Sequence, residues 1–206
     1  MYLITDYIDD PDIERSILGE PVSQDQKYQA NVLLVWHERI DESYVAKFDK
    51  LQGVVRYGVG YDNIDLEVLS KRAIVFCNTP DYGVDEVSDT AVGMILNISR
   101  GISVYDRQSR SLTGQRWQEQ RISSLNRNSD QIIGIIGAGR IGGSVCQKLK
   151  SIGFEVVFYD PYVCSGYEKM LGVGRVRSLP ELLAISDQVS IHTPLTCETR
   201  GMIDDD

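Results

Sequence analysis

The sequence predicts an α/β protein whose parallel strands alternate with helices. Short apolar runs of strand length recur between stretches with helical periodicity along the chain. The run at 132–136 is apolar on both faces, which suits a central strand of a parallel sheet. A glycine-rich turn follows that run directly and leads into another helical pattern. These three observations indicate an open, helix-covered parallel sheet.

The first hundred residues contain the predicted elements of one such sheet. Asp41 is expected to cap a helix over 41–50, because its carboxylate can accept hydrogen bonds from the first turn. A longer helix is predicted from Val84 to about Arg100, where apolar residues recur at helical spacing. The remaining predictions here are strands at 2–5, 31–36, 53–57 and 74–77 and a helix at 66–72.

The second hundred residues begin with an interruption. Residues 101–130 are polar and mixed, which predicts a hinge or a projecting arm, in which Trp117 would anchor a helix or a dimer contact. The strand and helix alternation resumes at Gln131. It predicts strands at 132–136, 155–159, around 176 and at 188–192, and helices at 141–152, 167–171 and 179–185.

Composition narrows the class of function. Of 206 residues, 30 are acidic and 21 basic, giving a net charge of −9, so a nucleic-acid partner is not expected. No apolar run approaches the ~20 residues of a membrane span, and the start lacks a secretory signal, so a cytoplasmic location is expected. The four cysteines form no CxxC pair and only two histidines are present, so no metal site is predicted.

The turn after the first central strand carries the strongest chemical signal. Gly137, Gly139 and Gly142 form a GxGxxG between a strand and a helix, which is the fingerprint of a dinucleotide-binding Rossmann unit. The glycines permit a tight turn, close approach of a pyrophosphate and close helix packing, and the helix start favours anions. Arg140 can add positive charge there. The alternative is a tight turn without a ligand.

Asp160 ends the next strand, 18 residues after the last glycine of the motif. A carboxylate in this position can accept hydrogen bonds from the adenosine ribose hydroxyls. It would repel the 2′-phosphate of NADP, so NAD is the expected cofactor. The alternative for Asp160 is a helix cap or a surface acid.

Further blocks of sequence accompany this motif in a fixed order from about residue 53 onward. They are Val55-Arg56-Tyr57-Gly58-Val59-Gly60-Tyr61-Asp62-Asn63-Ile64-Asp65, Asn78-Thr79-Pro80, Val84-Asp85-Glu86, Ile135-Ile136-Gly137-Ala138-Gly139-Arg140-Ile141-Gly142, Tyr159-Asp160-Pro161, and His192-Thr193-Pro194-Leu195-Thr196 with Glu198-Thr199.

This set of blocks resembles the NAD-dependent D-isomer-specific 2-hydroxyacid dehydrogenases, with phosphoglycerate dehydrogenases and C-terminal binding protein corepressors most similar. The resemblance implies a flavodoxin-like substrate-side domain over residues 1–99. It also implies the first half of a Rossmann NAD-binding domain over residues 100–206, incomplete at the C-terminus. The first fifty residues agree with the family only in pattern.

The resemblance also implies roles for individual residues. The loop Gly58-Val59-Gly60 would hold the substrate carboxylate through backbone N–H groups, and Arg56 would help to bind the acidic substrate. A structural arginine paired with a carboxylate is the alternative for Arg56. His192 is expected to be structural. The cofactor would contact Gly137, Ala138, Gly139, Arg140, Ile141, Gly142, Asp160, Thr193 and Pro194.

The activity implied is hydride transfer between NAD(H) and a 2-hydroxy or 2-oxo acid. The family's catalytic arginine, glutamate and histidine have no matching positions up to Asp206, so no catalytic residue is assigned and this chain is expected to be inactive. Whether the truncation is natural stays open, as does an alternative function as a non-catalytic NAD-binding scaffold resembling the corepressors. A homodimer is expected, because the last predicted strand would form an open sheet edge.

Overall fold

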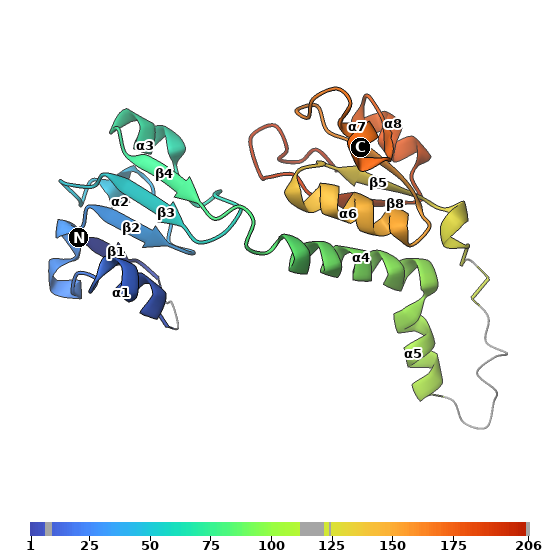
Figure 1. The fold of residues 1–206 in the computed structure, drawn as a ribbon, viewed down its shortest axis with the longest axis horizontal. Coiled ribbons are helices and arrows are strands. Elements are labelled where there is room, and N and C mark those ends of the chain that lie inside the picture. The colour runs from blue at the N-terminus through green and yellow to red at the C-terminus, as the bar shows by residue number, and fades with distance from the viewer. Residues whose placement is uncertain (7–9, 112–121, 124, 205–206) are drawn as a thin grey trace. The chain divides into compact units, whose positions relative to one another are not determined.

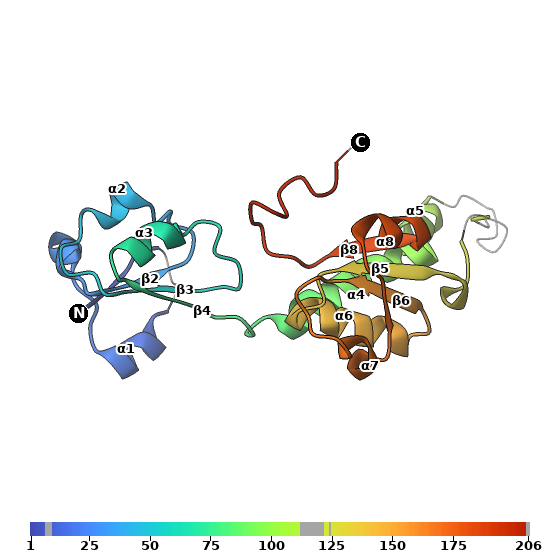
Figure 2. The ribbon, with the colours of Figure 1, turned by 90° about the horizontal axis from the view of Figure 1, so that it is seen from above.

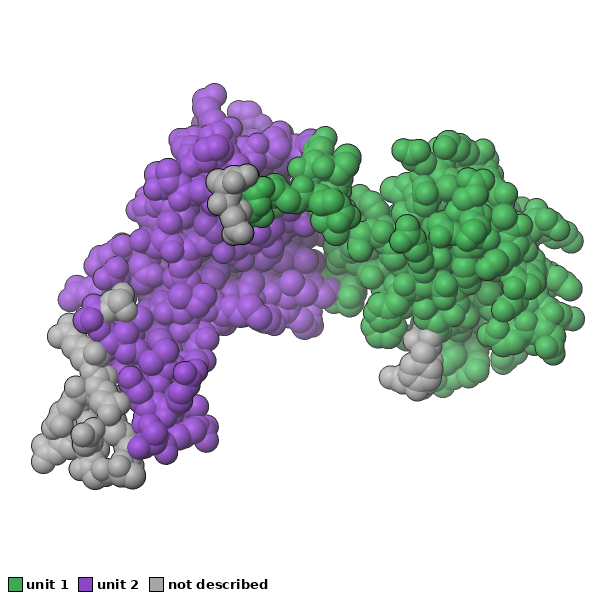
Figure 3. All heavy atoms as spheres, turned by 180° about the vertical axis from the view of Figure 1, so that it is seen from behind, with its two compact units in different colours: residues 1–82, 194–206 green, residues 83–193 purple. Residues whose placement is uncertain are grey.

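The computed structural model describes residues 1–6, 10–111, 122–123 and 125–204. Its chain forms two compact units, residues 1–82 with 194–206 (unit 1) and residues 83–193 (unit 2), shown in different colours in Figure 3. Each unit contains one four-stranded parallel sheet flanked by helices. The predicted α/β class with parallel sheets is therefore confirmed.

The sheet of unit 1 has the strand order β1-β2-β3-β4, so its strands follow one another as in the chain. Parallel register pairs Val35 with Arg56 and Arg56 with Asn78, so the carboxyl ends of these strands meet at one edge. The arrows of β2, β3 and β4 point the same way in Figure 1. The strands are β1 (Tyr2–Ile4), β2 (Val32–Val35), β3 (Gly53–Arg56) and β4 (Val75–Asn78).

Short helices connect these strands. The apolar core of unit 1 lies between the sheet and α2 and α3, and it includes Leu33, Val54 and Leu69. Asp41 caps α2 as expected, since its Oδ1 accepts from the backbone N–H of Tyr44 at 3.0 Å. The helices are α1 (Asp12–Leu18), the 3-10 helix η1 (Gln24–Gln29), α2 (Glu42–Val45) and α3 (Leu66–Lys71).

Three features of the first sheet's surroundings differ from the sequence prediction. The helix expected over 41–50 ends at Val45, because the chain continues in turns in which Phe48 N–H donates to the Val45 carbonyl. Phe48 still reaches the core. The helices α1 and η1 were not predicted; they bury no residue and so leave no apolar stripe in the sequence.

Unit 2 has the strand order β7-β6-β5-β8, in which β5 is central and β8 is an edge. Figure 2 shows α8 on one side of this sheet and α6 and α7 on the other. The larger core lies on the α4 and α6 side, where Ile133, Ile135 and Phe158 are fully buried. The strands are β5 (Ile132–Ile136), β6 (Glu155–Tyr159), β7 (Gly174–Arg175) and β8 (Gln188–Ile191).

The helices of unit 2 largely match the prediction. The polar arm contains a described helix, α5, and residues 112–121 with Trp117 lie outside the described part of the chain. No helix of the described residues is long and apolar enough to cross a membrane. The elements are α4 (Val84–Arg100), α5 (Ile102–Arg110), the 3-10 helix η3 (Asn128–Asp130), α6 (Arg140–Ser151), α7 (Tyr167–Leu171) and α8 (Leu179–Ile185).

The helix α4 belongs to unit 2, although the sequence prediction placed the domain boundary after residue 99. Its first turns are tied to α6 by Lys148, whose Nζ lies 2.7 Å from both Asp89 Oδ1 and Ser88 Oγ. Ser88 Oγ also lies 3.1 Å from Ser144 Oγ. These contacts explain why the compact units separate at residues 82 and 83.

Candidate cofactor and substrate sites

Two glycines of the glycine-rich loop of unit 2 are required by the fold itself. Gly137 has a φ of +86°, and an added Cβ would lie 2.9 Å from the His192 carbonyl oxygen. At Gly142 an added Cβ would overlap the Gly137 carbonyl oxygen. Gly137 therefore permits the turn and Gly142 the close approach of α6, as the motif predicts.

Gly139 has no such structural reason. Its φ of −67° suits any residue, and nothing lies within 4 Å of an added Cβ. It caps α6 without a side-chain hydrogen bond, and the first turn of this helix contains no acidic residue. The helix start therefore presents open space, backbone N–H groups and Arg140, which together suit a phosphate group.

Asp160 joins the end of β6 to the glycine loop. Its Oδ2 accepts from the backbone N–H of Ala138 and its Oδ1 from that of Tyr162, both at 2.9 Å. Each carboxylate oxygen can accept a further hydrogen bond. The residue thus orders the loop and keeps acceptor capacity for a diol such as a ribose.

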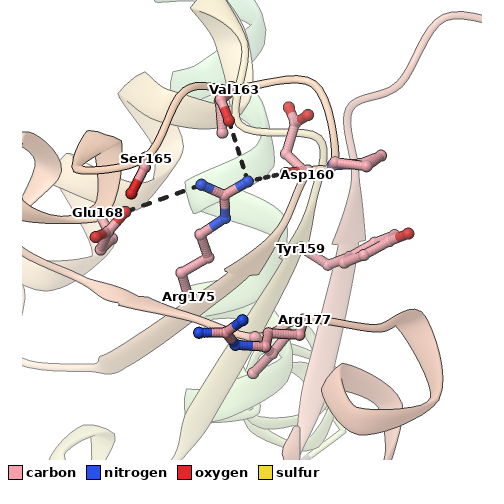
Figure 4. A pocket seen from close by; sticks show the side chains of 9 residues that line it. Tyr159, Asp160, Val163, Ser165, Glu168, Arg175 and Arg177 are labelled. Carbon is pink, nitrogen blue, oxygen red and sulfur yellow. Dashed lines mark hydrogen bonds and ion pairs between the residues drawn. The ribbon is translucent and has the colours of Figure 1, made fainter.

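A cavity of about 540 Å³ lies beside Asp160, between the end of β6, α7 and β7 (Figure 4). Arg175 crosses it and donates to the carbonyls of Asp160 at 2.7 Å, Val163 at 3.1 Å and Cys164 at 3.2 Å. Its guanidinium also lies 5.7 Å from the centre of the Phe158 ring. Arg175 therefore fixes the backbone after β6 and with it Asp160.

Sequence reasoning missed this arginine, because no local pattern links a two-residue strand to a loop 11–15 residues earlier. Arg177 lines the same cavity, and its guanidinium has no hydrogen bond or ion pair within the described ranges. The two arginines come from neighbouring positions but have different surroundings. Only Arg175 is engaged by the protein.

Three expected residues follow β8. The Thr193 methyl group would lie 2.9 Å from a Cβ at Gly137, so Thr193 packs against the glycine loop. Pro194 belongs to unit 1 by its contacts. His192 Nε2 lies 2.9 Å from Ser190 Oγ, and burial lowers the pKa of His192 below its usual 6.5. These contacts agree with the expected structural role of His192.

The predicted substrate loop of unit 1 follows β3. Gly58 has a φ of +148°, and the Arg56 guanidinium packs directly over its Cα. The Gly58 N–H donates to Thr79 Oγ1 at 2.7 Å. Where the chain is described, the backbone N–H groups of Val59 and Gly60 have no acceptor.

Arg56 has no ion pair with any described carboxylate, and its Nε is buried without a partner. This geometry does not provide the structural ion pair that was the alternative for this residue. A guanidinium beside two unpaired N–H groups suits a carboxylate ligand. The described ranges contain no group of three or more histidine, cysteine, aspartate or glutamate side chains that could hold a metal ion.

These features define a dinucleotide-binding α/β protein. Residues 92–206, more than half of the chain, match the family model described as D-isomer specific 2-hydroxyacid dehydrogenase, NAD binding domain. The chain belongs to this family, as the sequence blocks indicated, and its expected cofactor, NAD, is confirmed.

Individual relatives agree with this assignment. The chain is 33% identical over 199 residues to a D-3-phosphoglycerate dehydrogenase of Mycobacterium bovis, covering 96% of this chain and 35% of the relative. It is 31% identical over 183 residues to C-terminal-binding protein 1 of Caenorhabditis elegans, covering 86% and 25%. The chain thus spans about a third or less of these relatives.

Solved structures show the same arrangement of elements. The D-lactate dehydrogenase of Aquifex aeolicus, complexed with NAD and lactic acid, superimposes with a TM-score of 0.74 at 28% identity, over 86% of this chain and 52% of that one. The apo form of D-mandelate dehydrogenase from Rhodotorula graminis gives a TM-score of 0.74 at 25% identity, over 85% and 55%.

Proposed function

We propose that the protein is an NAD-dependent oxidoreductase that moves hydride between NAD(H) and C2 of a 2-hydroxy or 2-oxo acid, as in phosphoglycerate dehydrogenases. The observation that carries this proposal is the open N-terminus of α6, where Gly139 faces empty space beside Asp160. NAD supplies the hydride acceptor, and this chain's residues bind and orient the reactants.

The residues proposed for the cofactor belong mainly to unit 2. Backbone N–H groups at the start of α6 and Arg140 would hold the pyrophosphate, and Asp160 the adenosine ribose. Thr193 and Pro194 would line the cofactor cleft. We propose residues 100–206 as the NAD-binding domain and 1–99 as the substrate-side domain, with α4, which packs within unit 2, as the helix that leads from one to the other. The full set proposed is Gly137, Ala138, Gly139, Arg140, Ile141, Gly142, Asp160, Thr193 and Pro194.

The residues proposed for the substrate lie in unit 1. The N–H groups of Val59 and Gly60 would donate to the substrate carboxylate, and the adjacent Arg56 guanidinium would neutralise its charge. This arrangement fixes the acid by its common functional group. Selection among different acids requires a further contact.

The proposal also includes the cellular location and the oligomeric state of the protein. We place the protein in the cytoplasm. We also propose a homodimer that uses the open edge of β8 and the neighbouring α4. A cavity of about 720 Å³ lies along that edge, where the apolar side chains of Met94, Ile98 and Ile191 are exposed.

The alternative is an NAD-binding scaffold that performs no catalysis. The similarity to C-terminal-binding protein 1 of Caenorhabditis elegans favours it. Such a protein would use the same glycine loop and Asp160 and would differ in the response to substrate. Cofactor binding alone does not distinguish the two functions.

Activity measurements on the protein that carries these residues distinguish them. NADH oxidation is followed with pyruvate, phenylpyruvate and phosphohydroxypyruvate, and NAD binding is measured by calorimetry on the same sample. Residues 1–206 alone are expected to bind NAD without turnover; in a protein that also carries the family's catalytic arginine, glutamate and histidine, oxidation with at least one acid is expected, with loss of turnover in Gly139→Val. In that protein, NAD binding without oxidation of NADH by any acid would favour the scaffold.

A further inference from the structure

The helix α1 of unit 1 is attached to its sheet with little apolar packing. Figure 2 shows α1 on one side of this sheet and α2 and α3 on the other. The helix buries no residue, and its apolar side chains Ile13 and Ile17 are 71% and 73% exposed. A helix of seven residues is not stable by itself in water, so polar contacts with the sheet have to hold it.

Two tyrosine hydroxyls from the sheet supply such contacts. Tyr57, directly after β3, donates to Glu14 Oε1 at 2.7 Å. Tyr2, in β1, donates to the carbonyl of Gly19, the residue that ends α1, also at 2.7 Å. Burial and the hydrogen bond to Glu14 raise the pKa of Tyr57 above its usual 10, so near neutral pH its hydroxyl keeps the proton that it donates.

Tyr57 also begins the loop proposed for the substrate carboxylate. Its backbone N–H donates to the last carbonyl of β2 at 2.7 Å, so the pairing of β2 with β3 extends to this residue. The N–H of the next residue, Gly58, donates to Thr79 Oγ1 at 2.7 Å. The N–H groups of Val59 and Gly60 follow directly. The side chain of Tyr57 is therefore attached to the backbone that carries the proposed carboxylate donors.

The start of this loop is held from both faces of the sheet. Successive side chains of a strand point to opposite faces, so Arg56 and Tyr57 leave the chain in opposite directions. The Arg56 guanidinium packs over Gly58, whereas the Tyr57 hydroxyl reaches Glu14 on α1. A hydrogen bond to a charged acceptor is stronger than one between neutral groups. Glu14 is thus suited to fix Tyr57, and a binding loop is only as well placed as the residues that support it.

We propose that Glu14 is a positioning residue for substrate binding, which acts through the Tyr57 hydroxyl on the loop that presents the Val59 and Gly60 N–H groups. This inference rests on the proposed dehydrogenase function and deepens it. The carboxylate is common to all 2-hydroxy and 2-oxo acids. The hydrogen bond between Glu14 and Tyr57 therefore supports the binding of every such acid by the same factor and does not select among them.

The test measures acid binding and loop stability on the same samples of the chain. Pyruvate and phenylpyruvate are titrated by calorimetry in the presence of NAD, and amide hydrogen exchange is followed by NMR at Gly58 and in α1. Tyr57→Phe keeps the ring and removes only the hydroxyl. It should weaken the binding of both acids by the same factor, about 5-fold, because one hydrogen bond that orders the loop is lost. The Gly58 N–H should exchange faster than in the wild-type chain.

Further variants separate the positioning of the loop from the attachment of α1. Tyr2→Phe is the matched control, because it removes the other hydroxyl bond to α1 and does not touch the loop. It should speed exchange in α1, as Tyr57→Phe does, and leave both acid affinities unchanged. Glu14→Ala should reproduce the loss of affinity, whereas Glu14→Gln, which keeps an acceptor oxygen, should retain most of the wild-type affinity. Combining Tyr57→Phe with Glu14→Ala should add no further loss, because both remove the same bond.

The outcomes distinguish this inference from the function on which it rests. If the wild-type chain binds the acids, the positioning role alone is overturned by unchanged affinity in Tyr57→Phe, by an equal loss in Tyr2→Phe, or by additive losses in the double variant. A loss confined to one of the two acids would also overturn it, since the carboxylate is common to both. If NAD binds and neither acid binds to the wild-type chain, the proposed dehydrogenase function and the positioning role both fail.

Discussion

The two candidate sites are built in different ways. In unit 2 most of the groups proposed to meet the cofactor lie in one short loop and at the end of β6, and most of them are backbone groups. In unit 1 the candidate substrate site joins the ends of neighbouring strands, since the Gly58 N–H after β3 donates to Thr79 Oγ1 after β4. A local site leaves a motif in the sequence, whereas an assembled site becomes visible only in the fold.

Glycine substitutions in unit 2 test the local site with the largest expected effect. Gly139→Val should weaken NAD binding by more than about 100-fold, because the side chain fills the space proposed for the pyrophosphate, equivalent to ~2.7 kcal/mol. Its melting temperature should change little, since the position is unstrained and open. Calorimetry and thermal unfolding give the two values.

Gly142→Ala is the contrasting variant in the same loop. Its Cβ would overlap the Gly137 carbonyl oxygen, so unit 2 should lose about 1–3 kcal/mol of stability. If Gly139→Val lowered stability as much as Gly142→Ala, Gly139 would be a structural glycine and not a ligand-contact position.

The edge of the second sheet should control self-association. Light scattering at micromolar concentration is expected to show a dimer, and Ile191→Lys should shift it to monomer by placing a charge on the open strand. Ile17→Lys on α1 is the control, because Ile17 is exposed in unit 1, and it should stay dimeric. A monomeric wild-type chain would contradict the proposal.

Arg175 shows that unit 2 also depends on distant contacts. Arg175→Met should cost about 1–3 kcal/mol, because the variant loses the donors to three backbone carbonyls after β6. NAD affinity should fall several-fold as Asp160 becomes less ordered. Arg177→Met, in the same cavity, should leave the free energy of unfolding unchanged; equal effects of both substitutions would mean that the carbonyl contacts do not matter.

The smallest expected effect is a difference between the two units in how their stability changes as the pH falls. Burial lowers the pKa of His192, so the unfolded chain takes up a proton below pH 6.5 before the folded unit 2 does. Stability is therefore fully present above pH 6.5 and declines as pH falls towards the folded pKa. His192→Gln should flatten this part of the unfolding free energy profile; an unchanged slope would contradict the burial argument.

In unit 1, Asp6 should make the free energy of unfolding depend on pH, but at a lower pH than His192 does in unit 2. Burial raises the pKa of Asp6, but hydrogen bonds, chiefly from the Trp36 N–H and Thr5, outweigh this and hold it below 3.8. Its contribution is present above pH 3.8 and is lost as pH falls through the folded pKa.

Most strands and the glycine loop could be predicted because their signals are local. Buried strands leave apolar runs, and Gly137 and Gly142 belong to a motif that lies within one βαβ unit. The Arg175 clamp could not be predicted, since its acceptors are carbonyls, which leave no mark on residue type. Trp36 was predicted as the last residue of a buried strand, whereas β2 ends at Val35 and Trp36 is exposed.

The most direct test of the local site is the ratio of NAD to NADP affinity, measured by calorimetry on the wild-type chain. We expect NAD to bind at least ~10-fold more tightly, equivalent to ~1.4 kcal/mol, because Asp160 would repel a 2′-phosphate and Arg175 is already engaged by carbonyls. Asp160→Asn, which keeps one acceptor oxygen for the loop, should shrink that ratio. Equal affinities, or tighter binding of NADP, would contradict the placement of Asp160 at the ribose and with it the account of unit 2.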